Sequence, residues 1–386
     1  MVNNILFFVS GFMIFWAMIG YPLSIKLLGK VYKDKKNRKN YALEPTVTIM
    51  IVAHNEEKVI KEKLDNVCNL NYPKDKLRIL VSSDNSTDNT NVIVENYIKD
   101  HDNEDITLYK VKERKGKTNA QNEAQKIVTT EFLVMTDANA LLDRNAIREL
   151  MASFVSEDIA YVTGCLKYVN SNQSSTSKSE STYWDSEVII RDIESKIQTI
   201  TAGNGALYAC RNSEYYDISP IECHDSSMPF DFALKKKRAL NNIDAIAYEK
   251  AGEKNKDEFN RKVRMNRLIL KVFKNTFKSF NFFKYKWFSF FYFGHRTCRY
   301  LLWVNHLLFF ITNAFNYNQN ILFMIVFIFQ VIVYLLYIIG TLCKLKNKYV
   351  RLINYYFMTV IAQWVAVYKS LTGKSKPFWE KAESTR

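Results

Sequence analysis

The sequence predicts an α/β domain with a mostly parallel β-sheet, held between transmembrane helices. Three observations support this fold class: strand-like and helix-like segments alternate through the middle of the chain, an uncharged apolar run opens it, and further apolar runs fill its last third. The mean hydropathy of the 386 residues is −0.20, so most of the chain lies outside a bilayer. The soluble part is long enough to bury one sizeable core.

The central domain is predicted from short runs rich in Val, Ile and Leu, which are typical of strands buried on both faces of a parallel sheet. Polar segments, some opened by Ser, Thr or Asp caps, separate these runs and are predicted to be helices. The predicted strands cover 46–53, 77–82, 106–111 and 131–136, and the predicted helices cover 57–67, 86–97, 118–128, 144–156 and 183–200. The polar, low-complexity stretch 170–180 is predicted to be either a flexible loop over the site or a disordered insert.

An apolar run near the N-terminus predicts the first membrane span. Residues Ile5 to Leu28 carry no charge before Lys26 and are long enough to cross a bilayer core of roughly 30 Å. The basic stretch from Lys30 to Lys39 follows directly. By the positive-inside rule the domain after this span is cytoplasmic, on a multi-pass protein of the inner or plasma membrane.

The C-terminal third contains one strong predicted span, Ile321–Cys343, and two weaker ones, 301–315 and 355–371. Before them, 280–293 is dense in Phe and Tyr with interleaved Lys, which favours an interfacial helix. Basic clusters flank the last weak span on both sides. Because both clusters favour the cytoplasm, either this segment does not cross or the charge rule is overridden.

These patterns predict the domain organisation and the kind of partner. The formal charge of +15 indicates a negatively charged partner, and its position beside apolar segments favours membrane lipids over nucleic acid. The six cysteines are scattered without a CxxC pair, which argues against a zinc site or a disulfide framework. The predicted segments are an N-terminal transmembrane helix at 1–28, a basic linker at 29–45, a cytoplasmic α/β domain at 46–270, amphipathic interfacial helices at 271–299, transmembrane helices at 300–371 and a basic tail at 372–386.

Polar residues stand at the carboxyl ends of three predicted strands. Asn55 and Glu56 follow the first strand, Asp84 follows the second, and Asp137 and Asn139 follow the fourth. Ligands of parallel sheets bind at these ends, so the residues are expected to share one binding site. No GxGxxG motif follows the first strand and no GxxxxGK(S/T) motif occurs, which excludes the common dinucleotide and P-loop sites.

Short motifs occur in a fixed order along almost the whole chain; each is weak alone, and the ordered set is specific. They are TIMIVAHNEE at 48–57, VSSDNSTD at 81–88, KGK at 115–117, TDAN at 136–139, GNGALY at 203–208, FDFAL at 230–234, RKVR at 261–264 and GHRTCR at 294–299. In these motifs the chain resembles family 2 glycosyltransferases of the membrane-bound polysaccharide-synthase type. The resemblance implies a GT-A fold, the fold of enzymes that use nucleotide-diphospho-sugars.

The resemblance assigns nucleotide-binding roles to particular positions. In the family the first strand and its Asn-Glu turn cradle the nucleoside, which implies Ala53, Asn55 and Glu56 here. Asp84 would accept hydrogen bonds from the base. Lys117 stands where a cation meets the diphosphate.

The segment Asp137–Asn139 matches the metal motif of the family, usually Asp-x-Asp, and implies Mg²⁺ or Mn²⁺ as cofactor. A hard divalent cation bridges diphosphate oxygens and stabilises the leaving nucleotide. Asp137 and Asn139 are therefore the predicted metal ligands, and Asp137 also counts as a nucleotide-binding residue. Asn139 departs from the family pattern, although an amide oxygen can also bind these ions.

Asp231 falls where the family carries its catalytic base, which takes the proton of the acceptor hydroxyl. The first acid of the usual pair is replaced by Phe230, and Asp225 is the alternative base.

The acceptor side is predicted at Gly203, Asn204 and Gly205, where glycine lets backbone approach a sugar closely. Arg264 is expected to bind phosphate. Arg264 matches the Arg of the QxxRW pattern found in processive synthases. Arg261 and Met265 stand where that pattern has Gln and Trp.

The resemblance implies an inverting glycosyltransferase that moves a hexosyl unit from a nucleotide sugar, with UDP-sugars as the first candidates, to a lipid-linked or polysaccharide acceptor at the cytoplasmic membrane face. Its expected partners are the donor, the acceptor, membrane lipids and polysaccharide export proteins. The degraded acidic pair leaves a second hypothesis open, a non-catalytic nucleotide-binding subunit of a polysaccharide synthesis or export complex.

Overall fold

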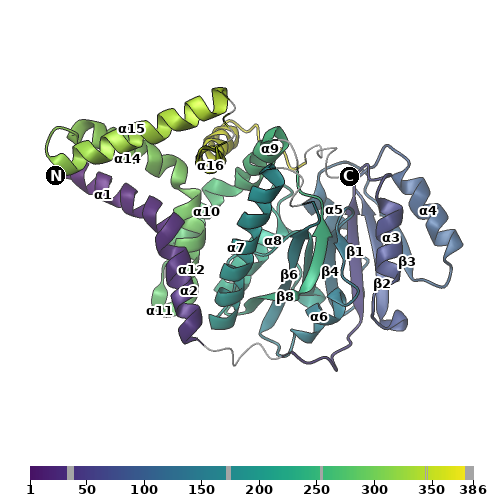
Figure 1. Ribbon diagram of the computed structural model, residues 1–386. Helices are drawn as coiled ribbons and strands as arrows, with labels where there is room; N and C mark the ends of the chain where they lie inside the picture. Colours follow the sequence, from purple (N-terminus) through teal and green to yellow (C-terminus); the bar gives the residue numbers. More distant parts are fainter. Residues whose placement is uncertain (33–38, 171–174, 253–254, 344, 346, 379–386) are drawn as a thin grey trace. The chain divides into compact units, whose positions relative to one another are not determined.

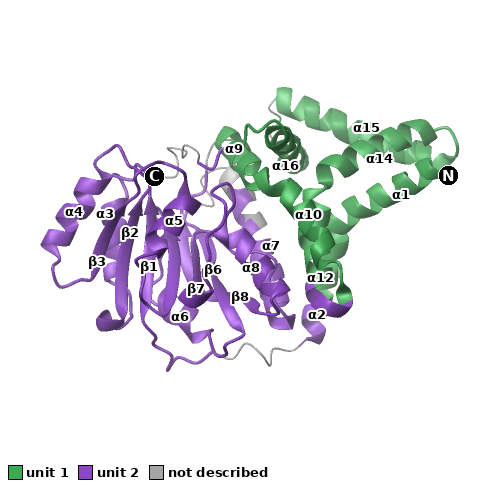
Figure 2. Cartoon of the chain, turned by 180° about the vertical axis from the view of Figure 1, so that it is seen from behind, with its two compact units in different colours: residues 1–27, 255–282, 289–375 green, residues 28–254, 283–288, 376–386 purple. Residues whose placement is uncertain are grey.

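The computed structural model describes residues 1–386 except 33–38, 171–174, 253–254, 344, 346 and 379–386. The chain forms two compact units (Figure 2). A helical unit comprises 1–27, 255–282 and 289–375, and an α/β unit comprises 28–254, 283–288 and 376–386. The predicted boundaries of the six segments stay predictions, and each unit is described by itself below.

The α/β unit contains one eight-stranded sheet among the described residues, in the order β3-β2-β1-β4-β7-β6-β8-β5 (Figure 1). The half formed by β3, β2, β1 and β4 is parallel throughout. β7 runs antiparallel to β4 and β6, β6 is parallel to β8, and β5 is antiparallel to β8. The strands are β1 Val47–Ala53, β2 Leu77–Ser83, β3 Ile106–Lys110, β4 Phe132–Asp137, β5 Leu141–Leu142, β6 Ile159–Tyr168, β7 Leu207–Arg211 and β8 Arg238–Glu249.

The predicted α/β fold class with a mostly parallel sheet is confirmed. Each of the four predicted strands exists, and the helices between them begin later or end earlier than predicted. The prediction of an irregular segment at 170–180 is wrong from Ser175 onward, because α7 begins there. Residues 171–174 lie outside the described residues. The helices of this unit are α3 Ile60–Cys68, α4 Thr90–Asp100, α5 Lys117–Gln125, α6 Ala146–Ala152, α7 Ser175–Ile197 and α8 His224–Leu234.

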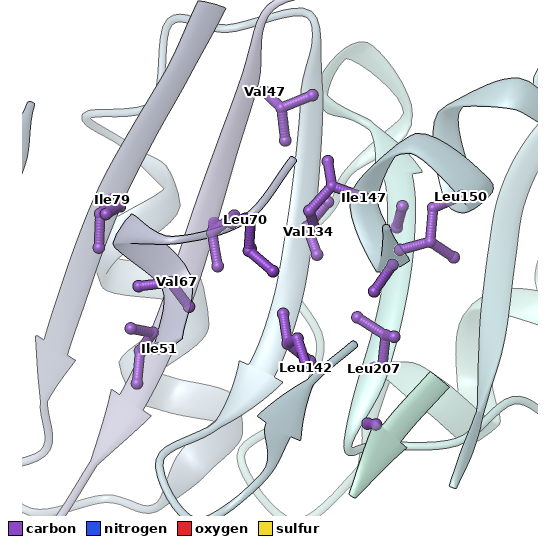
Figure 3. Packing of buried hydrophobic residues seen from close by; sticks show 14 of the residues in the cluster. Val47, Ile51, Val67, Leu70, Ile79, Val134, Leu142, Ile147, Leu150 and Leu207 are labelled. Carbon is purple, nitrogen blue, oxygen red and sulfur yellow. The ribbon is translucent and has the colours of Figure 1, made fainter. Parts of the chain in front are cut away.

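Two hydrophobic cores lie on the two faces of the sheet. Ile49 and Ile51 of β1 pack into one core together with residues of α3, α4 and α6. Met50 and Val52 of the same strand belong to the other core, which α5 and α8 complete. Side chains alternate between the faces of a strand, so β1 fills both cores with apolar residues at every position except Thr48, whose hydroxyl bonds that of Thr130 at 2.7 Å. Figure 3 shows the first core, to which Val134 of β4 and Leu207 of β7 also belong.

Three helices of the described residues are long and apolar enough to cross a membrane: Val2–Val31, Ile321–Leu342 and Lys348–Leu371. The first consists of α1 and α2 joined by a π-helical turn at Trp16–Gly20. The helices that lie wholly or partly in the helical unit are α1 Val2–Phe15, α2 Tyr21–Val31, α9 Asn255–Met265, α10 Ile269–Ser279, α11 Phe282–Tyr285, α12 Trp287–Phe291, α13 Cys298–Tyr300, α14 Leu302–Asn316, α15 Ile321–Leu342 and α16 Lys348–Leu371.

The first helix of this unit packs against α14 in the opposite direction. The Asn3 side chain donates to the carbonyl oxygen of Thr312 at 3.1 Å, near the end of α14. Ala17 shares a hydrophobic cluster with Leu302, at the start of α14. Between these contacts the rings of Phe7 and Phe309 stack with centroids 4.8 Å apart. The pair therefore forms an antiparallel hairpin in space, although the α/β unit separates the two helices in sequence.

Candidate active site

The carboxyl ends of β1, β2 and β4 meet at one edge of the sheet, as the sequence predicted. Ala53 is the register partner of Ser83, directly before Asp84, and Val52 is the partner of Asp137. Ala53, Asp84 and Asp137 therefore start from neighbouring strands at the same level. This edge carries the residues expected to bind a nucleotide.

The turn after β1 is locked to the turn after β2 by side chains. Asn55 has a φ of 53°, in the left-handed region that Asn tolerates. Its side-chain oxygen accepts from the Thr87 backbone N–H at 2.8 Å, and its own backbone N–H donates to Ser86 Oγ at 3.2 Å. The Glu56 backbone N–H donates to Thr90 Oγ1 at 2.8 Å. The predicted positions Asn55 and Glu56 thus belong to one rigid rim of the site.

The Asp84 carboxylate orients the loop that precedes Lys117. Its two oxygens accept from the backbone N–H groups of Lys115 at 3.1 Å and Gly116 at 2.9 Å. Gly116 has a φ of 95°, a conformation open to glycine and strained for other residues. In this structure Asp84 acts on the loop that presents Lys117, in addition to lying at the edge where a base is expected to bind.

Lys117 and Asp137 form an ion pair at the centre of this edge. Lys117 Nζ donates to Asp137 Oδ1 at 2.6 Å and to the carbonyl oxygen of Gly205 at 2.9 Å. Burial disfavours the charged ammonium, but the carboxylates of Asp137 and Asp225 outweigh this cost and raise the pKa of Lys117 above its ordinary value. Lys117 is therefore a fixed cation that links the end of β4 to the predicted acceptor loop.

The residues at the end of β4 fit a divalent cation that also binds a diphosphate. Asp137 and Asn139 offer a carboxylate and an amide oxygen, the hard ligands that Mg²⁺ and Mn²⁺ prefer. Among the described residues there is no group of three His, Cys, Asp or Glu side chains that could hold a metal ion. A site of this composition therefore suits an ion that takes its remaining ligands from phosphate oxygens and water.

The predicted acceptor loop approaches its neighbours very closely. A Cβ on Gly203 would lie 2.0 Å from Tyr161 Oη, which leaves no room for a side chain. Asn204 is buried and caps its own turn, since its side-chain oxygen accepts from the Ala206 backbone N–H at 3.0 Å. A Cβ on Gly205 would meet Lys117 Nζ at 3.5 Å and Asp225 Oδ2 at 3.7 Å, both ordinary contacts.

The structure brings Asp225, rather than Asp231, to this group. Asp225 lies in the first turn of α8, and its carbonyl oxygen accepts from the Gly203 backbone N–H at 2.7 Å. Asp231 accepts from the Tyr216 hydroxyl at 2.6 Å, and burial together with this bond raises the pKa of that tyrosine. A helix rises about 1.5 Å per residue, so the two aspartates are about 9 Å apart along α8.

The remaining predicted residue, Arg264, lies on α9 in the helical unit and is not among the residues that the α/β unit brings together. Its role stays a prediction. Sequence reasoning missed Lys63, a fully buried lysine on α3 that contacts Thr136 and Ala140 on either side of the predicted metal ligands. The helical periodicity of the sequence could have identified it, because Lys63 falls on the apolar face of the helix between Ile60 and Val67.

Comparison with known proteins identifies the domain that carries this site. The family model described as glycosyl transferase family 2 matches residues 48–216. A probable glycosyltransferase of Bacillus subtilis, YdaM, is 32% identical over 177 residues, which cover 44% of this chain and 42% of that protein. A poly-beta-1,6-N-acetyl-D-glucosamine synthase of Staphylococcus aureus is 29% identical over 119 residues, 31% of this chain and 28% of that protein. The matches therefore span less than half the length of these relatives.

A solved structure extends the likeness in fold. A mannosyltransferase from Pyrobaculum calidifontis, in complex with GDP-mannose and Mn²⁺, superposes with a TM-score of 0.74 at 20% identity and covers 96% of this chain and 99% of that one. At this identity the likeness shows the fold, which is the GT-A fold. The chain therefore carries, over residues 48–216, a glycosyltransferase domain of family 2.

Proposed function

We propose that the chain is an inverting glycosyltransferase that moves a hexosyl unit from a nucleotide sugar to a lipid-linked or polysaccharide acceptor. The observation that carries this proposal is the convergence of Lys117, Asp137 and Asp225 at one edge of the sheet. A cation, a metal-binding carboxylate and a second carboxylate are the groups that displacement of a nucleotide diphosphate by a hydroxyl needs.

The rim residues account for donor binding. Asn55 and Glu56 on one side and Asp84 on the other frame the place for the nucleoside, and Lys117 meets the diphosphate. On donor binding, the Lys117 ammonium exchanges part of its bond to Asp137 for phosphate oxygens. Asp137 and Asn139 would hold Mg²⁺ or Mn²⁺ against the same diphosphate, where the ion neutralises the charge that develops on the leaving nucleotide.

Asp225 is the proposed base. Its carboxylate lies beside Gly205, on the predicted acceptor side, and close to the cation of Lys117. The acceptor hydroxyl would lose its proton to Asp225 as its oxygen attacks the anomeric carbon, and the bond from that carbon to the diphosphate breaks on the opposite side. In-line attack of this kind inverts the configuration of the sugar.

The choice between the two aspartates is testable with one pair of variants. Asp225→Asn removes the base without changing the size of the side chain, so transfer should fall by about 10²–10⁴-fold while nucleotide affinity is kept. Asp231→Asn should keep most of its activity, because Asp231 is bonded to Tyr216, whereas the carboxylates that act on Lys117 are those of Asp137 and Asp225. Nucleotide release from UDP-, GDP- and dTDP-sugars with Mn²⁺ measures both. If only Asp231→Asn lost nucleotide release, the catalytic base would be Asp231, as the motif predicted.

The proposed site of action is the cytoplasmic face of the inner or plasma membrane. The basic stretch after the first span supports this orientation. The names of the relatives include a polymer synthase and, from Nostoc, a beta-monoglucosyldiacylglycerol synthase that is 28% identical over 142 residues, 36% of this chain and 30% of that protein. Both a growing polysaccharide and a lipid are therefore candidate acceptors, and polysaccharide export proteins are candidate partners.

A further inference from the structure

A lysine is buried beneath the predicted metal ligands. Lys63 lies on α3 with 0% of its surface exposed, on the helix face that Ile60, Leu64 and Val67 turn toward the core. Burial of an ammonium group is costly unless polar partners satisfy its donors. An apolar residue would fill this place on α3 at a lower cost, so the partners of Lys63 indicate why the chain uses a hydrogen-bond donor here.

The two contacts of Lys63 bracket the metal-binding turn. Its Nζ atom donates to Thr136 Oγ1 at 2.9 Å and to the carbonyl oxygen of Ala140. Thr136 directly precedes Asp137, and Ala140 directly follows Asn139. The turn itself is closed by a hydrogen bond from the Ala140 backbone N–H to the Asp137 carbonyl at 3.2 Å. One side chain therefore holds both ends of the segment that carries the two predicted ligands.

A second residue of α3 holds the chain just beyond this turn. The side chain of Asn66 donates to the Leu142 carbonyl at 2.9 Å and accepts from the Leu142 backbone N–H at 2.8 Å. Asn66 is neutral, and its two side-chain hydrogen bonds go to Leu142 of β5 rather than to the residues from Thr136 to Ala140. It therefore provides a matched comparison, because its loss loosens the same helix contact two residues farther along the chain.

We propose that Lys63 is a positioning residue for the divalent metal, which holds the Asp137–Asn139 turn in the conformation that presents both oxygen ligands to one ion. This inference rests on the metal role given to Asp137 and Asn139 in the proposed function. Lysine suits the task because its long stem reaches out of α3 and its ammonium has several donors to share between two acceptors. Groups that orient metal ligands in this way commonly change metal affinity when they are lost.

The test is a titration of the full chain in detergent with Mn²⁺, in the presence and absence of UDP, with free Mn²⁺ measured by electron paramagnetic resonance. Lys63→Met and Thr136→Val each break the contact, one by removing the donor and the other by removing an acceptor. Both should weaken Mn²⁺ binding by about 10–100-fold. UDP binding without metal should be unchanged in both, and Asn66→Ala should lower the melting temperature while it keeps the Mn²⁺ affinity of the wild type.

Three results would overturn the inference. Unchanged or tighter Mn²⁺ binding in Lys63→Met would show that the contact does not position the ligands. Opposite shifts in Lys63→Met and Thr136→Val would assign the effect to the charge of Lys63 rather than to its hydrogen bonds. Wild-type protein whose UDP binding ignores Mn²⁺ would overturn the metal role in the proposed function as well, and this is seen before any variant is made. If Lys63→Met does not fold, Thr136→Val decides alone.

Discussion

At the scale of single residues, the site is built from charged groups whose partners fix their position before a ligand arrives. Lys117 is held by Asp137 and by the Gly205 carbonyl, and Asp84 is held by two backbone N–H groups. Fixed dipoles and charges of this kind lower the cost of reorganisation during the reaction. The sequence identified these residue types and their strand ends, but it could not show which partner each side chain takes.

The proposed catalytic base illustrates what sequence motifs alone cannot decide. The motif placed it at Asp231, inside the segment FDFAL, whereas Asp225 lies in the turn that contacts Gly203. The two residues lie on one helix, and only the packing of that helix against the sheet decides which carboxylate reaches the site. The prediction of Asp231 is untested, and the variants described above separate it from Asp225.

His224, the neighbour of Asp225, makes the stability of the folded protein depend on pH. His224 is buried and its Nδ1 lies 3.0 Å from Gln121 Oε1. Burial disfavours the imidazolium and lowers the pKa of His224 from 6.5 to about 3. Because the unfolded chain binds this proton at higher pH than the folded chain, the contribution to stability is present above pH 6.5 and is lost as the pH falls toward 3.

The free energy of unfolding should therefore fall by up to roughly 1.4 kcal/mol per pH unit through this one group. His224→Gln, which keeps a polar partner for Gln121, should flatten that part of the profile. Denaturant unfolding of the wild type and the variant between pH 7 and 4 measures the difference. Parallel profiles for the two proteins would show that His224 takes up its proton in the folded state.

At the scale of elements, the strands predicted correctly are β1, β2, β3 and β4, and of these only the edge strand β3 is not largely buried. β1 is buried along its whole length and apolar except for Thr48, because each face of the sheet has its own core. The later strands were missed: β6 is interrupted by Gly164, and β8 carries Asn241, Asn242 and Asp244. Their pairing joins segments far apart in the chain, which local patterns do not report.

The acceptor loop provides a prediction at this scale, because its two glycines have different surroundings. Gly203→Ala would drive a methyl group into the buried hydroxyl of Tyr161 and should destabilise the protein by about 1–3 kcal/mol. Gly205→Ala meets only ordinary contacts and should fold normally. Its methyl group would stand between Lys117 and Asp225, so transfer should fall while stability is kept.

Thermal melting together with nucleotide release distinguishes the two effects. Equal melting temperatures for both variants would contradict the close approach of Gly203 to Tyr161. Full activity in Gly205→Ala would place the acceptor elsewhere than beside Lys117 and Asp225.

At the scale of the whole molecule, the helical unit suggests how the chain crosses the membrane. α14 runs opposite to the first helix. α15 in turn runs opposite to α14, because residues later in α14 contact residues earlier in α15. His306 Nδ1 lies 3.1 Å from Tyr334 Oη, and the side chains of Asn313 and Gln330 lie 2.9 Å apart. If the first helix, α14 and α15 each cross, α15 ends on the cytoplasmic face, where its following basic cluster is expected. α16 is also long and apolar enough to cross, but the basic clusters at both of its ends favour a place on that same face.

Cysteine labelling tests this orientation. Cys343 is exposed directly after α15 and should react with an impermeant maleimide only after cells are permeabilised. Cys223 is replaced by Ser in this experiment, because this half-buried thiol could also react with the maleimide. As a control, Asn318→Cys in a chain lacking Cys343 should react from outside, since it lies between α14 and α15. Labelling of Cys343 from outside would contradict the crossing by α14.

The measurement that tests the central claim most directly is the transfer of a labelled sugar. Membranes containing the chain are incubated with Mn²⁺ and nucleotide sugars that carry the label in the sugar, and the label is followed into lipid and polymer fractions. The account predicts that one donor passes its label to an acceptor together with release of the nucleotide, and that Asp225→Asn abolishes both. A donor that binds the wild type in the presence of native lipids without any release or transfer would contradict the account and favour a non-catalytic nucleotide-binding subunit.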